Sequence, residues 1–379
     1  MIKILQMNSG TKEFGGVSSF VYEIYKRIDK DRIQFDFYSP GCSTYKIYEA
    51  EINKMGGSLI EKPIINNKII KYFHNFFLIL NFLKKNNYDI VHVNSGNIFF
   101  NVTASLAAKL AKTSVVIVHS HNSNSSAGIK KYIERNVKKI LTLSTDVFLA
   151  CSKKAGENMF SRNIVESKMQ VIPNGIDLTR FKFSQNERSR IRQELGLEDK
   201  YILGHIGRFN KQKNHMFLID IFDQVKKEVP NSVLILIGDG MDKQKIKSRV
   251  SELGIEDSVL FLGIRKDVHL FYSVFDVFLL PSLYEGLPIV GVESQASGLP
   301  MLVSDQITRE LSLTNLVNYL PIDEGTDIWT SEIKKNSRFK DSTSRTQTFE
   351  EIKKSQYSIE DTVDKLTYIY ERTYYEKNI

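Results

Sequence analysis

Short apolar runs alternate with segments of helical periodicity along almost all of this 379-residue sequence, and this alternation constrains the fold more than any other feature. Several runs, such as Val115–Val118 and Val233–Ile237, consist only of β-branched and aliphatic residues. Continuous runs of this kind are typical of strands that are buried on both faces in parallel sheets covered by helices. The alternation therefore predicts an α/β protein with two doubly wound units.

The predicted strands fall into two sets, separated by a turn signal at Pro173–Asp177 and a polar stretch over residues 184–200. Beyond about Gly325 the strand signals stop, and the chain ends in an amphipathic helix. The two sets comprise residues 2–7, 35–38, 89–94, 114–121 and 146–151, and residues 201–207, 232–237, 259–262, 277–280 and 300–303.

The composition excludes several classes of protein. The hydrophobic fraction is 42% and the charged fraction 25%, which is typical of a globular protein and not of a disordered or fibrous one. Two cysteines, Cys42 and Cys151, form neither a disulfide framework nor a zinc spacing, so we expect a reducing, cytoplasmic environment. The most apolar stretch, residues 76–83, is far shorter than the ~20 residues that span a bilayer, which predicts a soluble or peripheral protein.

Unusual residues follow the predicted strands of the first half, where open parallel sheets bind ligands. Gly15 and Gly16 open a helix and allow backbone N–H groups to approach an anion, although a glycine pair is more often only a turn. They do not form the G-x-G-x-x-G fingerprint, which argues against a dehydrogenase. His119 and His121 share one face of the chain, but they lack a third metal ligand, and a hydrogen-bonded strand end is the alternative interpretation.

The second half carries cations at a strand tip. Arg208 directly follows the strand and Lys213 comes five residues later, a spacing that can bracket a diphosphate in place of a magnesium ion. A solvated basic loop is the alternative. Gly238, Gly240 and Gly263 end the next two strands and permit close approach of a ligand.

The segment over residues 280–300 contains two carboxylates separated by seven residues. Pro288 suits the start of a helix and Gly298 its end, so Glu285 precedes the helix and Glu293 lies inside it. Glu285 has the alternative role of a helix cap. Glu293 lies in a largely apolar helix, and a buried carboxylate needs polar partners, for which sugar hydroxyls are suitable.

These motifs resemble those of family 4 of the retaining glycosyltransferases. Glu285 and Glu293 match its E-x7-E motif, and Gly207–Lys213, Val171–Asp177 and the Gly15–Gly16 loop match as well. The sequence around His119 and His121 is similar to that of bacterial capsule and exopolysaccharide transferases.

The resemblance implies the GT-B fold, in which two Rossmann-like doubly wound domains face each other across a cleft. Residues 1–178 would form the acceptor-binding domain and residues 179–356 the nucleotide-sugar-binding domain. The C-terminal helix, residues 357–379, would pack back on the first domain.

The resemblance also implies roles for individual residues. The expected catalytic set is Glu285, Arg208, Lys213 and one of His119 and His121, with His121 favoured but the register ambiguous. Glu293 would bind the nucleotide ribose, Glu285 the donor sugar, and Arg208 and Lys213 the diphosphate. The expected donor-binding residues are Gly15, Gly16, Arg208, Lys213, Gly263, Ile264, Glu285, Gly286, Leu287 and Glu293.

The resemblance thus implies a hexosyl- or N-acetylhexosaminyltransferase that uses a nucleotide-diphosphate sugar, in particular a UDP-sugar. Its acceptor would be a lipid-linked oligosaccharide of capsule or exopolysaccharide biosynthesis, and no cofactor or metal ion would be required. A sugar-nucleotide epimerase of the same fold and a non-catalytic membrane-binding module are the alternatives. A nucleic-acid partner is not expected, because the sequence lacks the aromatic–basic motifs of nucleic-acid-binding domains.

The net charge of +8 is concentrated in the first half. Residues 62–88 contribute +5 and residues 130–139 contribute +4, which leaves −1 for the rest of the chain. Aromatic residues interleave with the lysines of the first segment. This pattern predicts peripheral contact with anionic lipid on the inner face of the cell membrane, and an ordinary solvated helix is the alternative.

Overall fold

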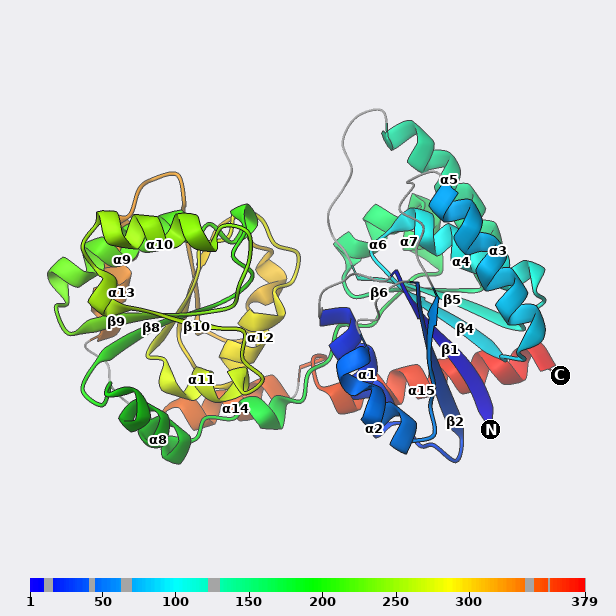
Figure 1. The fold of residues 1–379 in the computed structure, drawn as a ribbon, viewed down its shortest axis with the longest axis horizontal. Coiled ribbons are helices and arrows are strands. Elements are labelled where there is room, and N and C mark those ends of the chain that lie inside the picture. Colours follow the sequence, from blue (N-terminus) through cyan, green and yellow to red (C-terminus); the bar gives the residue numbers. More distant parts are fainter. Residues whose placement is uncertain are drawn as a thin grey trace. The chain divides into compact units, whose positions relative to one another are not determined.

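The computed structural model describes residues 1–9, 16–40, 45–62, 70–121, 130–337, 344–353 and 355–378. They form two compact units (Figure 1), of which the first comprises Met1–Ile176 with Ile359–Ile379 and the second Asp177–Ser358. The backbone N–H of Ile359 donates to the carbonyl of Ile176 over 3.0 Å, so the chain leaves and re-enters the first unit at adjacent points.

The first unit is built on a seven-stranded sheet with the order β3-β2-β1-β4-β5-β6-β7. All pairings between these strands are parallel. The strands are β1 (Ile2–Asn8), β2 (Ile33–Pro40), β3 (Leu59–Lys62), β4 (Ile90–Asn94), β5 (Val115–Ser120), β6 (Val147–Ala150) and β7 (Gln170–Val171).

Helices cover both faces of this sheet, as the continuous apolar strands predict. Adjacent residues of β1 show this, because Ile4 belongs to a core that includes α1 and α15, whereas Leu5 belongs to a core that includes α3, α4 and α5. The helices are α1 (Gly16–Arg27), α2 (Glu49–Lys54), α3 (Ile70–Lys85), α4 (Ile98–Leu110), α5 (Lys130–Ser144), α6 (Lys153–Met159), α7 (Arg162–Ser167) and α15 (Ile359–Asn378).

The second unit has a six-stranded parallel sheet with the order β10-β9-β8-β11-β12-β13. Figure 1 shows α9, α10 and α13 on one face of it and α8, α11, α12 and α14 on the other. The strands are β8 (Tyr201–Ile206), β9 (Ser232–Ile237), β10 (Val259–Gly263), β11 (Val277–Leu280), β12 (Met301–Ser304) and β13 (Val317–Leu320). The helices are α8 (Gln185–Leu195), α9 (His215–Glu228), α10 (Lys243–Glu252), α11 (Val268–Val274), α12 (Ile289–Ala296), α13 (Asp327–Ser337) and α14 (Ser344–Lys353).

All ten predicted strands are present, with ends that differ by at most two residues from the prediction. The prediction missed β3, β7 and β13, and each of these lies at an edge of its sheet. Both predicted doubly wound sheets are therefore confirmed.

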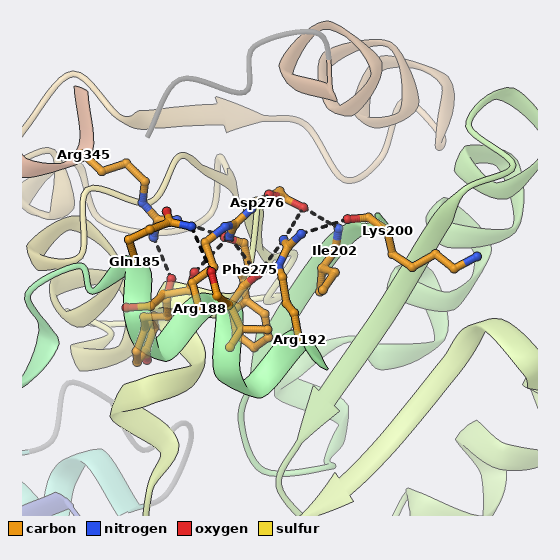
Figure 2. A network of polar contacts seen from close by, with 12 residues as sticks. Gln185, Arg188, Arg192, Lys200, Ile202, Phe275, Asp276 and Arg345 are labelled. Atoms are coloured by element: carbon orange, nitrogen blue, oxygen red, sulfur yellow. Dashed lines mark hydrogen bonds and ion pairs between the residues drawn. The ribbon is translucent and has the colours of Figure 1, made fainter. Parts of the chain in front are cut away.

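A network of arginines fixes the helices beside β11 (Figure 2). The carboxylate of Asp276, just before β11, forms ion pairs with Arg188 and Arg192 of α8 and accepts a hydrogen bond from the backbone N–H of Ile202 over 2.7 Å. The guanidinium of Arg345 in α14 donates to the carbonyls of Tyr272, Phe275 and Ser297. Asp276 thus joins α8 to the central strands of the second unit.

We predict that Asp276→Ala destabilises the second unit by about 3 kcal/mol, because it leaves two largely buried arginines without their counter-charge. Urea unfolding followed by the fluorescence of Trp329 measures this directly, since Trp329 is the only tryptophan in the sequence and lies in the core of this unit. The control is Glu228→Ala, which removes an exposed ion pair with Lys334 and should cost less than about 1 kcal/mol. Equal effects of the two substitutions would contradict this account of the network.

Candidate functional site

The tips of β8 and β9 form a close junction in the second unit. The N–H of Phe209 donates to the carbonyl of Asp239 over 2.9 Å, and Gly238 has a φ of +140°. A Cβ atom at Gly238 would lie 2.0 Å from the carbonyl oxygen of Gly207, so only glycine fits at this position. Arg208 is exposed at this junction, at the carboxyl edge of the sheet.

Lys213 and Glu285 form an ion pair beside this junction. Their Nζ and Oε1 atoms are 2.6 Å apart, and the side chains are only 15% and 11% exposed. The side-chain amide of Gln212, the residue before Lys213, donates to the carboxylate of Glu285 over 3.1 Å and to the carbonyl of Tyr284 over 3.0 Å. The turn after β8 is thereby fastened to the loop after β11, which brings two of the predicted site residues into contact.

The backbone conformation of Asn214 explains why an asparagine directly follows Lys213. Its φ of +55° and ψ of +43° are left-handed, a conformation that glycine and asparagine adopt most readily. The side chain also donates to the carbonyl of Pro281 over 3.2 Å. Asparagine can therefore adopt the backbone conformation of this turn as glycine would, and it adds a hydrogen bond to the residue that follows β11.

Glu293 lies within α12 and accepts a hydrogen bond from the hydroxyl of Tyr272 in α11 over 2.5 Å. Burial raises the carboxyl pKa of Glu293 to about 7, and the Tyr272 hydroxyl and the charge of Arg180 oppose this rise. Burial and the neighbouring Glu293 carboxylate also raise the pKa of Tyr272 well above its ordinary value. Tyr272 is not predictable from the sequence, since nothing in the local pattern distinguishes it from a core aromatic residue.

The remaining predicted residues of the second unit lie at the same carboxyl edge of its sheet. Gly263 ends β10 with a φ of +65° and accepts a hydrogen bond from the N–H of Gly238, while Ile264 is 81% exposed. Gly286 and Leu287 are partly buried in the loop before α12. Because β10, β9, β8 and β11 are consecutive neighbours, their tips carry these groups along one edge.

The candidate histidines lie at the carboxyl edge of the first sheet. His119 is fully buried, and its Nε2 is 3.3 Å from the carbonyl oxygen of Ile172. His121 is partly buried between Asn94 and Asn174, with its ring 4.1 Å from that of His119. A third histidine, His92 in β4, stacks on His119 at 5.6 Å. Burial lowers the pKa of all three, to about 3 for His92 and about 4 for His121.

Both candidate glycines belong to the first unit. Gly16 is the first residue of α1, and a Cβ atom there would meet no atom within 4 Å among the described residues. Gly15 lies outside the described residues.

Two kinds of feature are absent from the described residues. None of the described helices is long and apolar enough to cross a membrane. Within the same ranges, no group of three or more histidine, cysteine, aspartate or glutamate side chains is arranged to hold a metal ion.

Comparison with known proteins gives two family matches. The model described as glycosyltransferase family 4 matches residues 14–180, and the model described as glycosyl transferases group 1 matches residues 187–315. A Bacillus subtilis protein named as a glycosyltransferase, EpsF, is 33% identical over 343 residues, which is 87% of this chain and 86% of EpsF.

A second relative and a solved structure extend the comparison. The Escherichia coli UDP-Gal:alpha-D-GlcNAc-diphosphoundecaprenol alpha-1,3-galactosyltransferase is 28% identical over 63% of this chain and 64% of its own length. The crystal structure of Anabaena HepE in complex with UDP-glucose superposes with a TM-score of 0.77 at 19% identity, covering 98% of this chain and all of HepE. The fold is therefore GT-B, and the chain is an enzyme that belongs to glycosyltransferase family 4.

Proposed function

We propose that this enzyme transfers a hexosyl or N-acetylhexosaminyl group from a UDP-sugar to a lipid-linked saccharide, with retention of anomeric configuration. The observation that carries the proposal is the Lys213–Glu285 pair at the carboxyl edge of the second sheet. It combines a cation suited to a diphosphate with a carboxylate suited to sugar hydroxyls, at the edge where doubly wound sheets bind ligands.

The names of similar proteins support the choice of substrates. HepE was crystallised with UDP-glucose, and the Escherichia coli relative is named for a UDP-galactose donor and a diphosphoundecaprenol-linked acceptor. A Campylobacter jejuni relative, 24% identical over 76% of this chain, is also named for a diphospho-undecaprenol-linked acceptor. We assign the product to capsule or exopolysaccharide assembly on the resemblance of the sequence motifs.

In the proposed reaction, Lys213 and Arg208 bind the diphosphate and stabilise the charge that develops on it as the sugar–phosphate bond breaks. Glu285 holds the hydroxyls of the donor sugar, and Glu293 accepts hydrogen bonds from the ribose. The departing phosphate takes the proton of the acceptor hydroxyl. Neither a protein nucleophile nor a metal ion is part of this proposal.

We also propose that α3 and α5 form a membrane-docking surface for anionic lipid. The helix α4 packs against both α3 and α5. These two helices carry exposed apolar side chains, namely Phe73 and Phe77 on α3 and Ile133, Ile140 and Leu143 on α5. Lys84 lies one heptad after Phe77, on the same face of α3, and Arg135 and Lys139 are exposed on α5. Apolar side chains bordered by cations match the chemistry of an anionic bilayer surface, where the lipid-linked acceptor resides.

The first test concerns the ion pair. We expect Lys213→Ala and Glu285→Ala each to lower kcat/KM by about 10²–10³-fold or more while the protein stays folded, because each removes a group that stabilises the transition state. Lys211→Ala, an exposed lysine of the same turn, is the matched control and should be near wild type. Wild-type turnover in both site variants would show that the site is assigned wrongly.

A donor screen tests the substrate class. Thermal shift and hydrolysis should be observed with UDP-sugars and be weaker or absent with GDP-sugars, and chelators should leave transfer unchanged. Turnover of a UDP-sugar to its epimer without any acceptor would instead identify an epimerase.

Replacing Glu293 by glutamine should have opposite effects on the stability of the protein and on its affinity for the donor. Its folded-state pKa of about 7 exceeds the ordinary value of 4.5, so its contribution to stability is present below pH 4.5 and is lost as the pH rises through 7. Glu293→Gln keeps an acceptor for the Tyr272 hydroxyl without a charge to bury. At pH 8 we expect the variant to be more stable than wild type by up to about 3 kcal/mol, but to bind the UDP-sugar at least about 10-fold more weakly.

Urea unfolding at pH 5 and pH 8, followed by Trp329 fluorescence, tests this expectation. At pH 5 the difference between Glu293→Gln and wild type should shrink to less than about 1 kcal/mol, because the carboxyl group of the folded wild type is then largely protonated. A variant that is less stable than wild type at pH 8 would contradict the assignment.

The docking surface predicts dependence on lipid charge. Phe77→Glu and Leu143→Glu should each lower binding to phosphatidylglycerol-containing vesicles in a sedimentation assay by about 10-fold, because each replaces an apolar contact by a repelled charge. Ile328→Glu, a similar change at an exposed position of α13 in the second unit, should leave binding unchanged. Binding that is independent of anionic lipid would refute the docking surface.

A further inference from the structure

A chain of hydrogen bonds runs from the C-terminal helix to His121 in the first unit. The Nε2 of Gln6 donates to the hydroxyl of Tyr370 in α15 over 3.2 Å, and the Nδ2 of Asn94 donates to the Oε1 of Gln6 over 2.8 Å. The Oδ1 of Asn94 is 3.3 Å from the Nε2 of His121, whose Nδ1 is 2.9 Å from the Oδ1 of Asn174. Side chains of β1, β4 and α15 therefore determine what surrounds the imidazole.

The amide of Asn94 has only one orientation that satisfies its neighbours. Its Nδ2 is 3.3 Å from the backbone carbonyl of His92, in addition to its bond with Gln6. A carbonyl oxygen only accepts hydrogen bonds, so the amide nitrogen must point toward it and the amide oxygen toward His121. Because an amide oxygen cannot donate, the Nε2 atom of His121 must carry a hydrogen.

The surroundings of His121 disfavour a second proton. Among the described residues, the titratable side chains placed against it are His119 of β5, His92 of β4 and, beyond His92, Tyr370 of α15. Burial lowers the pKa of both neighbouring histidines and that of His121, which falls to about 4 although the hydrogen bond with Asn174 opposes this fall. A neutral ring with its hydrogen on Nε2 has a lone pair on Nδ1, which an amide oxygen cannot satisfy. The amide of Asn174 must therefore be reversed, so that its NH₂ group replaces the Oδ1 that faces Nδ1. Among the described residues His121 is the only hydrogen-bond partner of this side chain, so the reversal breaks no other bond, in contrast to Asn94.

We propose that Asn94 and Asn174 are positioning residues that hold His121 as a neutral imidazole with its hydrogen on Nε2. With both ring nitrogens engaged, His121 does not take the proton of the acceptor hydroxyl during transfer. This inference rests on the proposed function for its role in the reaction, whereas the tautomer itself is a property of the folded chain.

The network also gives α15 a function at this edge of the sheet. Tyr370 holds Gln6 and also lies 2.7 Å from the Nδ1 of His92, and both of these residues contact Asn94. Since α15 packs into the same core as α1, the returning C-terminal helix anchors the residues that orient His121.

The test is long-range ¹H–¹⁵N NMR of the full chain labelled in histidine, with His121→Ala used to identify the His121 signals. We expect the wild-type ring to be the Nε2–H tautomer and to remain neutral down to about pH 5. Asn94→Asp places a carboxylate at Nε2 and should raise the pKa of His121 by about 1–3 units, and the pH profile of kcat should gain an inflection at the new pKa. The control is Asn97→Asp, the same exchange three residues away at the N-cap of α4, where aspartate also caps the helix. This variant should change neither the pKa of His121 nor the pH profile of kcat.

An Nδ1–H tautomer, a wild-type pKa near 6.5 or an unchanged pKa in Asn94→Asp would overturn the inference. The wild-type tautomer is decisive even where Asn94→Asp does not fold. The NMR result needs neither donor nor acceptor, so a failure of the proposed glycosyl transfer would appear separately, as absent turnover with the tautomer intact.

Discussion

The burial of both sheets on both faces is the constraint on which the rest of the structure depends. A parallel strand that is covered by helices has no solvent-facing side, so its residues are mostly apolar and its polar residues gather toward its carboxyl end. In β5, for example, Val115–Val118 is buried throughout and the polar residues His119, Ser120 and His121 follow. Because all strands of a sheet are parallel, their carboxyl ends coincide, and residues far apart in sequence meet there.

The same constraint explains how charged groups are held at these edges. Lys213 and Glu285 are largely buried and neutralise each other, and Gln212 fixes the carboxylate from a second side. An unpaired buried charge costs several kcal/mol, so a donor that replaces one partner must supply equivalent contacts. Glu293 meets the same difficulty differently, since its raised pKa and the Tyr272 hydroxyl reduce the cost of burying it.

The sequence predicts the parts of the fold and site that depend on local patterns. The ten predicted strands, the E-x7-E helix and the lysine turn each have a distinctive residue pattern, and each appears in the structure. The edge strands β3, β7 and β13 were missed because they are short and partly exposed, and so lack the continuous apolar signal. Tyr272, Gln6 and Tyr370 were missed for another reason, since only the tertiary fold brings them to Glu293 and to the histidines.

The central claim is that the second unit binds the donor so that the acceptor attacks the face from which the diphosphate departs. The most direct measurement is the anomeric configuration of the transferred sugar, determined by NMR on the product formed from an α-linked UDP-sugar. The account predicts an α-linked product. A β-linked product would show that the acceptor attacks from the opposite face, and would contradict the account.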